Sequence, residues 1–175
     1  TIHDLSALLY PQFHSRYNRL YLRFALPLCA RKASRIIVVS ENTRQDVIKQ
    51  FGPALAARIR VTPLGIIDES YFEDLPPAQL RQILSPYGLA EQPYLLNVGT
   101  IEPRKNQARL VEAYAKLVNN SGNLEIPTLV LAGRPGWGGE YERVQSIVQK
   151  YGLTLRNGQL QGSAVGQVLW LTQVK

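Results

Sequence analysis

The sequence predicts an α/β protein built as two blocks of parallel strands and helices. Runs of β-branched and other apolar residues alternate with helix-like segments over residues 33–62, and the alternation begins again at residue 94. This alternation is typical of parallel sheets covered by helices. The stretch 68–93 between the blocks is acidic and rich in proline, as connections between domains often are. We therefore expect two Rossmann-like halves.

Each element of the first block has its own signal. A basic, leucine-rich segment at 14–33 predicts a helix that Pro27 should kink or interrupt. The apolar run at 35–39 predicts a buried parallel strand. Ser40 suits the N-cap of the next helix, because its hydroxyl can accept a hydrogen bond from a free amide of the first turn. The elements expected after it are a helix at 41–51, which Gly52 and Pro53 end, and a short strand at 59–62.

The second block follows the same alternation. Its expected elements are, in order, a short helix at 78–84, a strand at 94–98, a helix at 106–118, a strand at 128–132, a glycine-rich loop at 133–139 and a helix at 140–151. After Leu153 the pattern fades, and the polar stretch and short apolar run of 154–175 receive no assignment.

The composition favours an anionic partner. The formal net charge is +7 and the pI is near 9.7, which suits a phosphate, a nucleic acid or a membrane surface without choosing among them. Nucleic acid is not expected, because the sequence has no recognised nucleic-acid-binding motif and no basic patch interleaved with aromatic residues. The single cysteine, Cys29, excludes an internal disulfide framework and fits the cytoplasm. No apolar run is long enough for a transmembrane helix, and no group of residues has the spacing of metal ligands.

The segment 99–106 is the strongest candidate site. It follows an expected strand and opens an expected helix, and in open α/β sheets ligands bind at the carboxyl ends of strands. The free N–H groups and the dipole of a helix N-terminus favour an anion. Arg104 and Lys105 would be unfavourable there without a ligand, by about 0.3–1 kcal/mol each, whereas a bound phosphate would reverse that sign. The alternative is that both are solvated surface cations.

Two further positions follow strand-like segments. Gly133 opens the loop 133–139, which could let the backbone approach a ligand or could be a simple strand-to-helix turn. His3 follows the short segment at the start of the chain. A histidine can act as a donor or a base, but a lone histidine is more often structural.

Taken in order, five stretches of the chain resemble GT-B glycosyltransferases of family 4. They are TIHDL at 1–5, ASRIIVVSENT at 33–43, VTPLGI at 61–66, NVGTIEPRKN at 97–106 and LVLAG at 129–133. Each stretch alone is moderately specific, and the ordered set covers about residues 1–153. The resemblance implies two partial Rossmann-like domains with a cleft between them. It divides the chain into the later part of an acceptor-side domain, a linker, the start of a donor-binding domain and a divergent tail, at 1–72, 73–92, 93–153 and 154–175.

The resemblance also implies roles. Arg104 and Lys105 would hold the diphosphate of a nucleotide-sugar donor, Gly99 would let the strand end approach that donor, and His3 would lie near the transferred sugar. Gly133 would belong to the donor site, and no metal or other cofactor would be needed. The residues after Gly133 are similar to those of bacterial mannosyltransferases, which favours GDP-mannose. The acceptor would be a glycan or a lipid-linked sugar, and the protein would act in the cytoplasm, with peripheral contact to the inner face of the cytoplasmic membrane.

The chain departs from the family pattern at three places. It has no counterpart of the glycine-rich loop of the acceptor side, and no two glutamates are separated by seven residues, as they are in the late motif of the family. It also lacks methionine and opens on a segment that reads like the end of a strand. We therefore expect a truncated and inactive copy of a hexosyltransferase. The alternative function is a non-catalytic module that binds a nucleotide or an anionic membrane.

Overall fold

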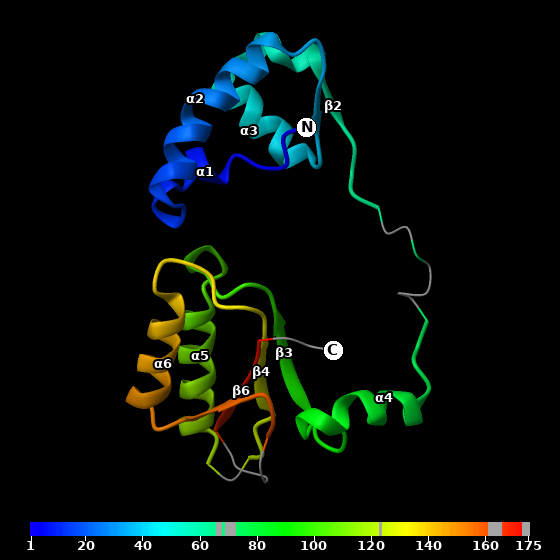
Figure 1. Cartoon of the computed structure of the whole chain (residues 1–175), viewed down its shortest axis with the longest axis vertical. Coiled ribbons are helices and arrows are strands. Elements are labelled where there is room, and N and C mark those ends of the chain that lie inside the picture. The colour runs from blue at the N-terminus through cyan, green and yellow to red at the C-terminus, as the bar shows by residue number, and fades with distance from the viewer. Residues whose placement is uncertain (66–67, 69–72, 123, 161–165, 173–175) are drawn as a thin grey trace. The chain divides into compact units, whose positions relative to one another are not determined.

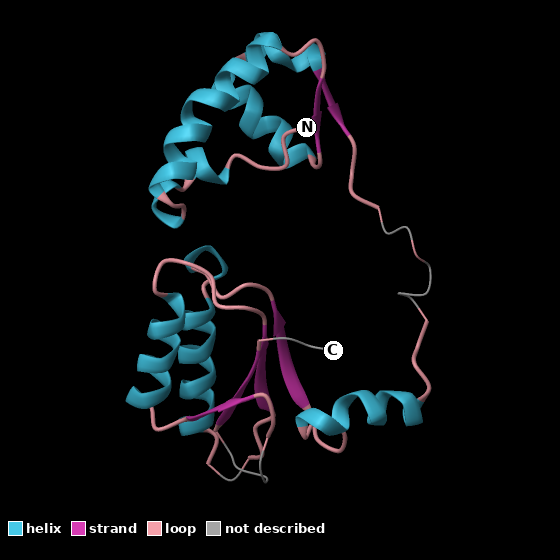
Figure 2. Ribbon diagram, viewed as in Figure 1, coloured by secondary structure: helices cyan, strands magenta, loops and turns pink. Residues whose placement is uncertain are grey.

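The computed structural model describes residues 1–65, 68, 73–122, 124–160 and 166–172 (Figure 1). The chain divides into two compact units, Thr1–Glu73 and Asp74–Lys175. Both contain parallel strands and helices, so the predicted α/β class is confirmed (Figure 2).

In its described residues, unit 1 holds a small parallel sheet and three α-helices. Its elements are α1 (Ser6–Leu9), η1 (Pro11–Phe13), α2 (Arg16–Lys32), β1 (Ile36–Val38), α3 (Glu41–Phe51), η2 (Pro53–Arg58) and β2 (Ile59–Val61). β1 pairs with β2 in parallel, with Ile36 opposite Ile59. Ile2 extends this sheet through a parallel bridge to Val38. The core of the unit joins the inner faces of α2 and α3 to these strands.

Two predictions about the helices of unit 1 have different outcomes. The Ser40 hydroxyl accepts a hydrogen bond from the Thr43 amide at 3.1 Å, which confirms Ser40 as the N-cap of α3. Pro27, in contrast, lies inside a continuous helix of 17 residues, so the interruption that we considered does not occur. A proline removes one amide from the hydrogen-bond ladder, but the turns on either side remain intact and Leu26 and Ala30 pack into the core of the unit.

Unit 2 is a four-stranded parallel sheet with helices. Its elements are α4 (Pro77–Leu84), η4 (Ser85–Tyr87), β3 (Tyr94–Val98), η5 (Pro103–Lys105), α5 (Gln107–Asn120), β4 (Thr128–Ala132), α6 (Glu140–Lys150), β5 (Thr154–Asn157) and β6 (Gln167–Leu171). The strand order is β3-β4-β6-β5, and every pairing is parallel. Figure 1 shows α5 and α6 side by side against the sheet.

Unit 2 has a core on each face of its sheet. On one face α5 and α6 pack on Leu129, Leu131, Val168 and Trp170. On the other face Leu89 and Leu160 pack on Val130 and Leu169. Both β4 and β6 are buried at all five positions, as expected of the central strands of a parallel sheet. β3 is an edge strand, and its residues Leu95, Leu96 and Val98 are exposed.

The residues around the predicted second block contribute more to the fold than the sequence indicated. The stretch 154–175, which we set apart as a tail, contains β5 and β6, and β6 lies between β4 and β5. The stretch 73–92, which we expected to be a linker, contains α4 and the buried Leu89, and both belong to unit 2. The boundary between the two units falls after Glu73.

Candidate functional site

The candidate site lies where β3 and β4 end. The two loops that leave these strands stay paired beyond the sheet. The Gly99 amide donates to the Ala132 carbonyl, Ile101 to Arg134, and Gly136 back to Ile101, each at 2.9 Å. These backbone bonds hold the segment after β3 against the glycine-rich loop after β4, so both loops have defined positions.

Gly133 is required by the close approach of these two loops. A Cβ atom at position 133 would collide with the carbonyl group of Gly99, with the carbonyl carbon only 2.6 Å away. Gly99 itself has a φ of +148°, a backbone conformation that residues other than glycine rarely adopt. A Cβ placed there would lie 3.8 Å from Cε of Lys105, so the Lys105 stem lies beside this strand end.

Arg104 and Lys105 lie in η5, one turn before α5 rather than in its first turn. We expected a helix from residue 106, but Asn106 has a left-handed conformation with a φ of +59° and separates η5 from α5. Pro103 fits the start of such a short turn, because it needs no amide partner. The two cations therefore come from a tight loop next to the helix and not from the helix end.

The Arg104 guanidinium already has a carboxylate partner. Its Nη2 lies 2.7 Å from Oε1 of Glu102, whose side chain is only 3% exposed, while that of Arg104 is 39% exposed. Arg104 is therefore an exposed cation with one fixed carboxylate partner. Lys105 is exposed and has no ion-pair partner among the described residues. The charge of Arg104 is locally balanced, whereas that of Lys105 is not.

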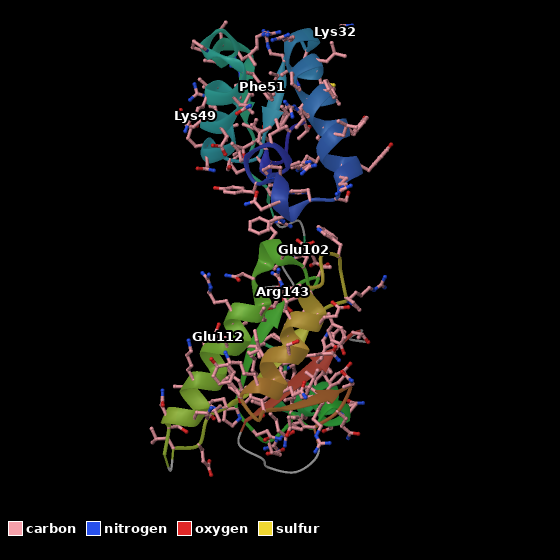
Figure 3. The ribbon with its side chains drawn as sticks, turned by 90° about the vertical axis from the view of Figure 1, so that its left-hand side faces the viewer. Lys32, Lys49, Phe51, Glu102, Glu112 and Arg143 are labelled. Carbon is pink, nitrogen blue, oxygen red and sulfur yellow. The ribbon has the colours of Figure 1, made fainter. Side chains whose placement is uncertain are left out.

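A second buried carboxylate lies at the N-terminus of α5. Glu140, the first residue of α6, is 2% exposed and accepts a hydrogen bond from the Ala108 amide at 2.9 Å through Oε1. Its other oxygen lies 3.7 Å from Nη1 of Arg143. Figure 3 shows Glu102 and Arg143 at the same end of unit 2, while Glu112 lies farther along α5. One of the helix amides that we expected to face a phosphate therefore has an internal anion as its partner.

The Gln107 side chain holds the segment after β3 through two hydrogen bonds to its backbone. This side chain is 1% exposed, and its Nε2 donates to the Thr100 carbonyl at 3.0 Å. Its Oε1 accepts from the Glu102 amide at 3.4 Å. Trp170 of β6 fixes the other loop, because its Nε1 donates to the Gly133 carbonyl at 2.8 Å. Both loops are thus held by side chains as well as by each other.

Sequence reasoning missed Glu102, Gln107, Glu140 and Trp170. Glu102 stands inside the quoted family stretch and could have been noticed as the acid nearest to the two cations. Glu140 gave no usable signal, because an acidic residue in the first turn of a helix is common and stabilising there. Trp170 belongs to the stretch that received no assignment, and its role depends on β6 pairing with β4.

His3 belongs to unit 1, unlike the other predicted site residues. It follows the Ile2 bridge at the carboxyl end of the small sheet, its side chain is exposed, and its carbonyl accepts from Thr43 Oγ1 at 3.2 Å. The structure therefore brings Gly99, Arg104, Lys105 and Gly133 together in unit 2, and it places His3 at the sheet edge of the other unit.

In the described part of the chain, no group of three or more histidine, cysteine, aspartate or glutamate side chains could hold a metal ion. No described helix combines the length and the apolar character that crossing a bilayer requires.

Comparisons with known proteins support the family resemblance of this chain. The family model of Glycosyltransferase Family 4 matches residues 1–70. O-antigen chain mannosyltransferase B of Escherichia coli is 34% identical over 137 residues, which are 78% of this chain and 35% of that relative. The chain is similar in sequence to glycosyltransferases of family 4.

The two matches include different parts of the chain. The family model matches residues of unit 1, whereas the Arg104–Lys105 turn lies in unit 2. The alignment to the relative is longer than either unit, so it includes residues of both. The chain spans about a third of the length of that relative, at 35%.

Proposed function

We propose that this chain takes part in hexosyl transfer from a nucleotide-sugar donor, with GDP-mannose as the preferred donor, to a glycan or lipid-linked acceptor. The observation that carries the proposal is the pair of adjacent cations, Arg104 and Lys105, beside the glycine end of β3. The relative named as an O-antigen chain mannosyltransferase supports a mannose donor. Peripheral contact with the inner face of the cytoplasmic membrane is part of the proposal.

Arg104 and Lys105 would hold the donor diphosphate in different ways. Glu102 contacts the Arg104 guanidinium through Nη2, and the other N–H groups of Arg104 would donate to the diphosphate. Lys105 brings a positive charge that no described carboxylate neutralises. Charge that develops on the departing diphosphate would be stabilised by both cations, which need little reorganisation in the paired loops. Lys105 should contribute the larger share of the attraction, because Arg104 shares its charge with Glu102.

The proposal is tested by titrating GDP and GDP-mannose, with UDP-glucose for comparison, into the 175-residue chain. We expect Lys105→Ala to weaken the binding of GDP by about tenfold or more, since a hydrogen bond to a charged group contributes roughly 1.5–3 kcal/mol. Arg104→Ala should weaken it less. The matched control is Lys150→Ala, which removes an exposed lysine of α6 outside the candidate site.

Equal affinity in the wild type and in the variant lacking both cations would contradict the proposed site. Sugar transfer is a separate readout. We expect no turnover from this chain alone, because it lacks the pair of glutamates implied by the family resemblance. Transfer of mannose or glucose by the isolated chain would show that expectation to be wrong while supporting the broader function.

The alternative candidate is a module that binds a nucleotide or an anionic membrane without transferring sugar. Binding of a nucleotide through Lys105 is compatible with it, because such binding requires no transfer step. Nucleotide binding without turnover, in a protein extended to the length of the relative, would favour this alternative.

A further inference from the structure

Strand β3 forms an open edge of the sheet in unit 2. It is the first strand in the order β3-β4-β6-β5, and among the described strands it pairs with β4 alone (Figure 1). Natural proteins usually protect such an edge with charged side chains or proline. The opposite edge strand, β5, carries Arg156. The five residues of β3 include no charged residue and no proline, so this edge lacks that protection.

The hydrogen bonds to β4 show which backbone groups of β3 face the open side. The Gly99 amide, one residue beyond the strand, donates to the Ala132 carbonyl of β4. Because the backbone groups of successive residues point to opposite sides of a strand, every second residue before Gly99 also faces β4. The N–H and C=O groups of Tyr94, Leu96 and Val98 therefore point away from β4. No backbone hydrogen bond joins these outward groups to another described residue.

The same three residues share one face of the sheet, because side chains alternate between the two faces along a strand. Leu96 lies opposite Val130 in the parallel register, and Val130 belongs to the core that also contacts Tyr94. Leu96 is nevertheless 56% exposed and Val98 is 70% exposed. The open edge thus combines backbone groups that lack partners with apolar side chains that solvent reaches.

We propose that β3 pairs in antiparallel fashion with β3 of a second copy of this chain, so that two sheets become one. The two-fold axis passes between Leu96 and Leu96 of the second copy. Each outward residue then belongs to a hydrogen-bonded pair, in which the two residues exchange both N–H···O bonds, and about six such bonds form. Leu96 faces its own copy, and Tyr94 faces Val98 of the second copy.

The sequence of β3 favours an identical strand as the partner. The pairing of Tyr94 with Val98 occurs twice, once on each side of the axis, and an aromatic residue opposite a β-branched one is a favourable cross-strand pair. The chain has a net charge of +7, but β3 has no charged side chain, so the paired strands oppose no like charges. The pairing involves unit 2 and no nucleotide, so it is independent of the function proposed for Lys105.

The first experiment is sedimentation equilibrium of the 175-residue chain at concentrations from about 1 μM to 1 mM. A strand of five residues gives a small interface, so we expect a monomer–dimer equilibrium with a dissociation constant inside that range. The two-fold pairing uses the whole open edge of β3, so association should stop at the dimer.

Amide hydrogen exchange, followed by NMR at two concentrations, tests which groups pair. We expect the amides of Leu96 and Val98 to exchange more slowly at the higher concentration, because they gain partners only in the dimer. The amides of Leu95 and Asn97 face β4 and serve as the internal control. Their exchange should be slow at both concentrations.

Substitutions at Leu96 separate the backbone contribution from that of the side chain. Leu96→Pro removes an amide that faces outward, a place where edge strands tolerate proline, and it should weaken the dimer at least about tenfold. Leu96→Val is the matched control, because it keeps the amide, and it should weaken the dimer less than about threefold. Leu96→Lys puts like charges opposite each other at the axis and should weaken the dimer at least about tenfold. Leu117→Lys, on α5 with Leu117 49% exposed, makes the same change away from β3.

Circular dichroism of each variant checks that the fold is intact. The proposal is overturned if the wild type stays monomeric up to the highest concentration, or if it grows into assemblies larger than a dimer. It is also overturned if a dimer forms but Leu96→Lys and Leu117→Lys weaken it equally, or if Phe24→Ser abolishes it, because Phe24 is an exposed apolar residue of α2 in unit 1. GDP titration of the monomeric Leu96→Lys variant reports separately on Lys105.

Discussion

At the residue scale, Gly133 shows how tightly the candidate site is built. A Cβ added there would meet the Gly99 carbonyl, and its three nearest atoms are all backbone atoms, which cannot rotate away as a flexible side chain could. The pairing of the two loops therefore depends on the absence of one side chain. Any larger residue must move the end of β3 away from β4, and that movement also displaces Lys105.

We predict that Gly133→Ala lowers the free energy of unfolding of unit 2 by about 1–3 kcal/mol, the usual range for overpacking. Urea titration followed by the fluorescence of Trp137 and Trp170 measures this change. The control is Gly65→Ala, where an added Cβ meets nothing within 4 Å. It should change stability by less than about 0.5 kcal/mol. An equally small effect at position 133 would mean that the loops are not held as the structure shows.

The residues of the site also show what sequence could predict. Gly99, Arg104 and Lys105 were singled out because a strand end, a glycine and two cations are local features, and the structure brings them together. Glu102 and Glu140 were missed because their importance depends on contacts. Glu140 accepts a hydrogen bond from the Ala108 amide, and the two residues are 32 positions apart in the sequence. No local pattern specifies that contact.

At the element scale, a buried phenol adds a hydrogen bond to the apolar packing of α5 on the sheet. The Tyr114 hydroxyl donates to the Gln167 carbonyl of β6 at 3.1 Å. Burial raises the pKa of Tyr114 above its ordinary value of 10.0, and a backbone hydrogen bond with Leu129 opposes this in part. The folded state therefore retains this proton more strongly than the unfolded state. The stabilisation is complete below about pH 10 and is lost as the pH rises through the higher folded-state pKa.

We predict that Tyr114→Phe costs about 1 kcal/mol of stability near neutral pH, because one hydrogen bond is lost. Above about pH 10 the variant should lose stability less steeply than the wild type, by up to about 1.4 kcal/mol per pH unit. Urea titrations of unit 2 at several alkaline pH values measure the slope. Tyr17→Phe, a change in the other unit, controls for the loss of one phenol. Parallel pH profiles for Tyr114→Phe and wild type would contradict the prediction.

The elements that sequence predicted best are those with a strong local pattern. β3, β4, α3 and α6 lie within a residue or two of their expected bounds. The two strands are short apolar runs, and the two helices have clear start and stop signals in the sequence. The strands β5 and β6 received no assignment, since Gly158 and Gly166 interrupt the pattern around them. β6 is fully buried only because it lies between two other strands. Its structure is decided by residues distant in sequence.

At the scale of the whole molecule, each unit has its own core. The core of unit 1 draws on residues between Ile2 and Ile59, and the two cores of unit 2 draw on residues between Leu89 and Leu171. No residue is shared between these sets. The acidic, proline-rich stretch indicated two blocks but placed the boundary only approximately, because α4 and Leu89 belong to unit 2 through their packing and not through their composition.

We predict that a cavity in one unit leaves the other unit's stability unchanged. Val47→Ala in α3 and Val168→Ala in β6 each remove methyl groups from fully buried side chains, at a cost of about 2 kcal/mol. Hydrogen exchange followed by mass spectrometry should show faster exchange of unit 1 in the first variant and of unit 2 in the second. Faster exchange of both units in either variant would show that they unfold as one cooperative body.

The strand order of unit 2 has a consequence for protein synthesis. Unit 1 leaves the ribosome with every residue of its core already translated, so it can fold while the rest of the chain is being made. Unit 2 cannot do the same. β4 and β5 are translated before β6, the strand that must separate them. Until residues 167–171 emerge from the exit tunnel, β4 and β5 lack the strand that pairs with their inner edges.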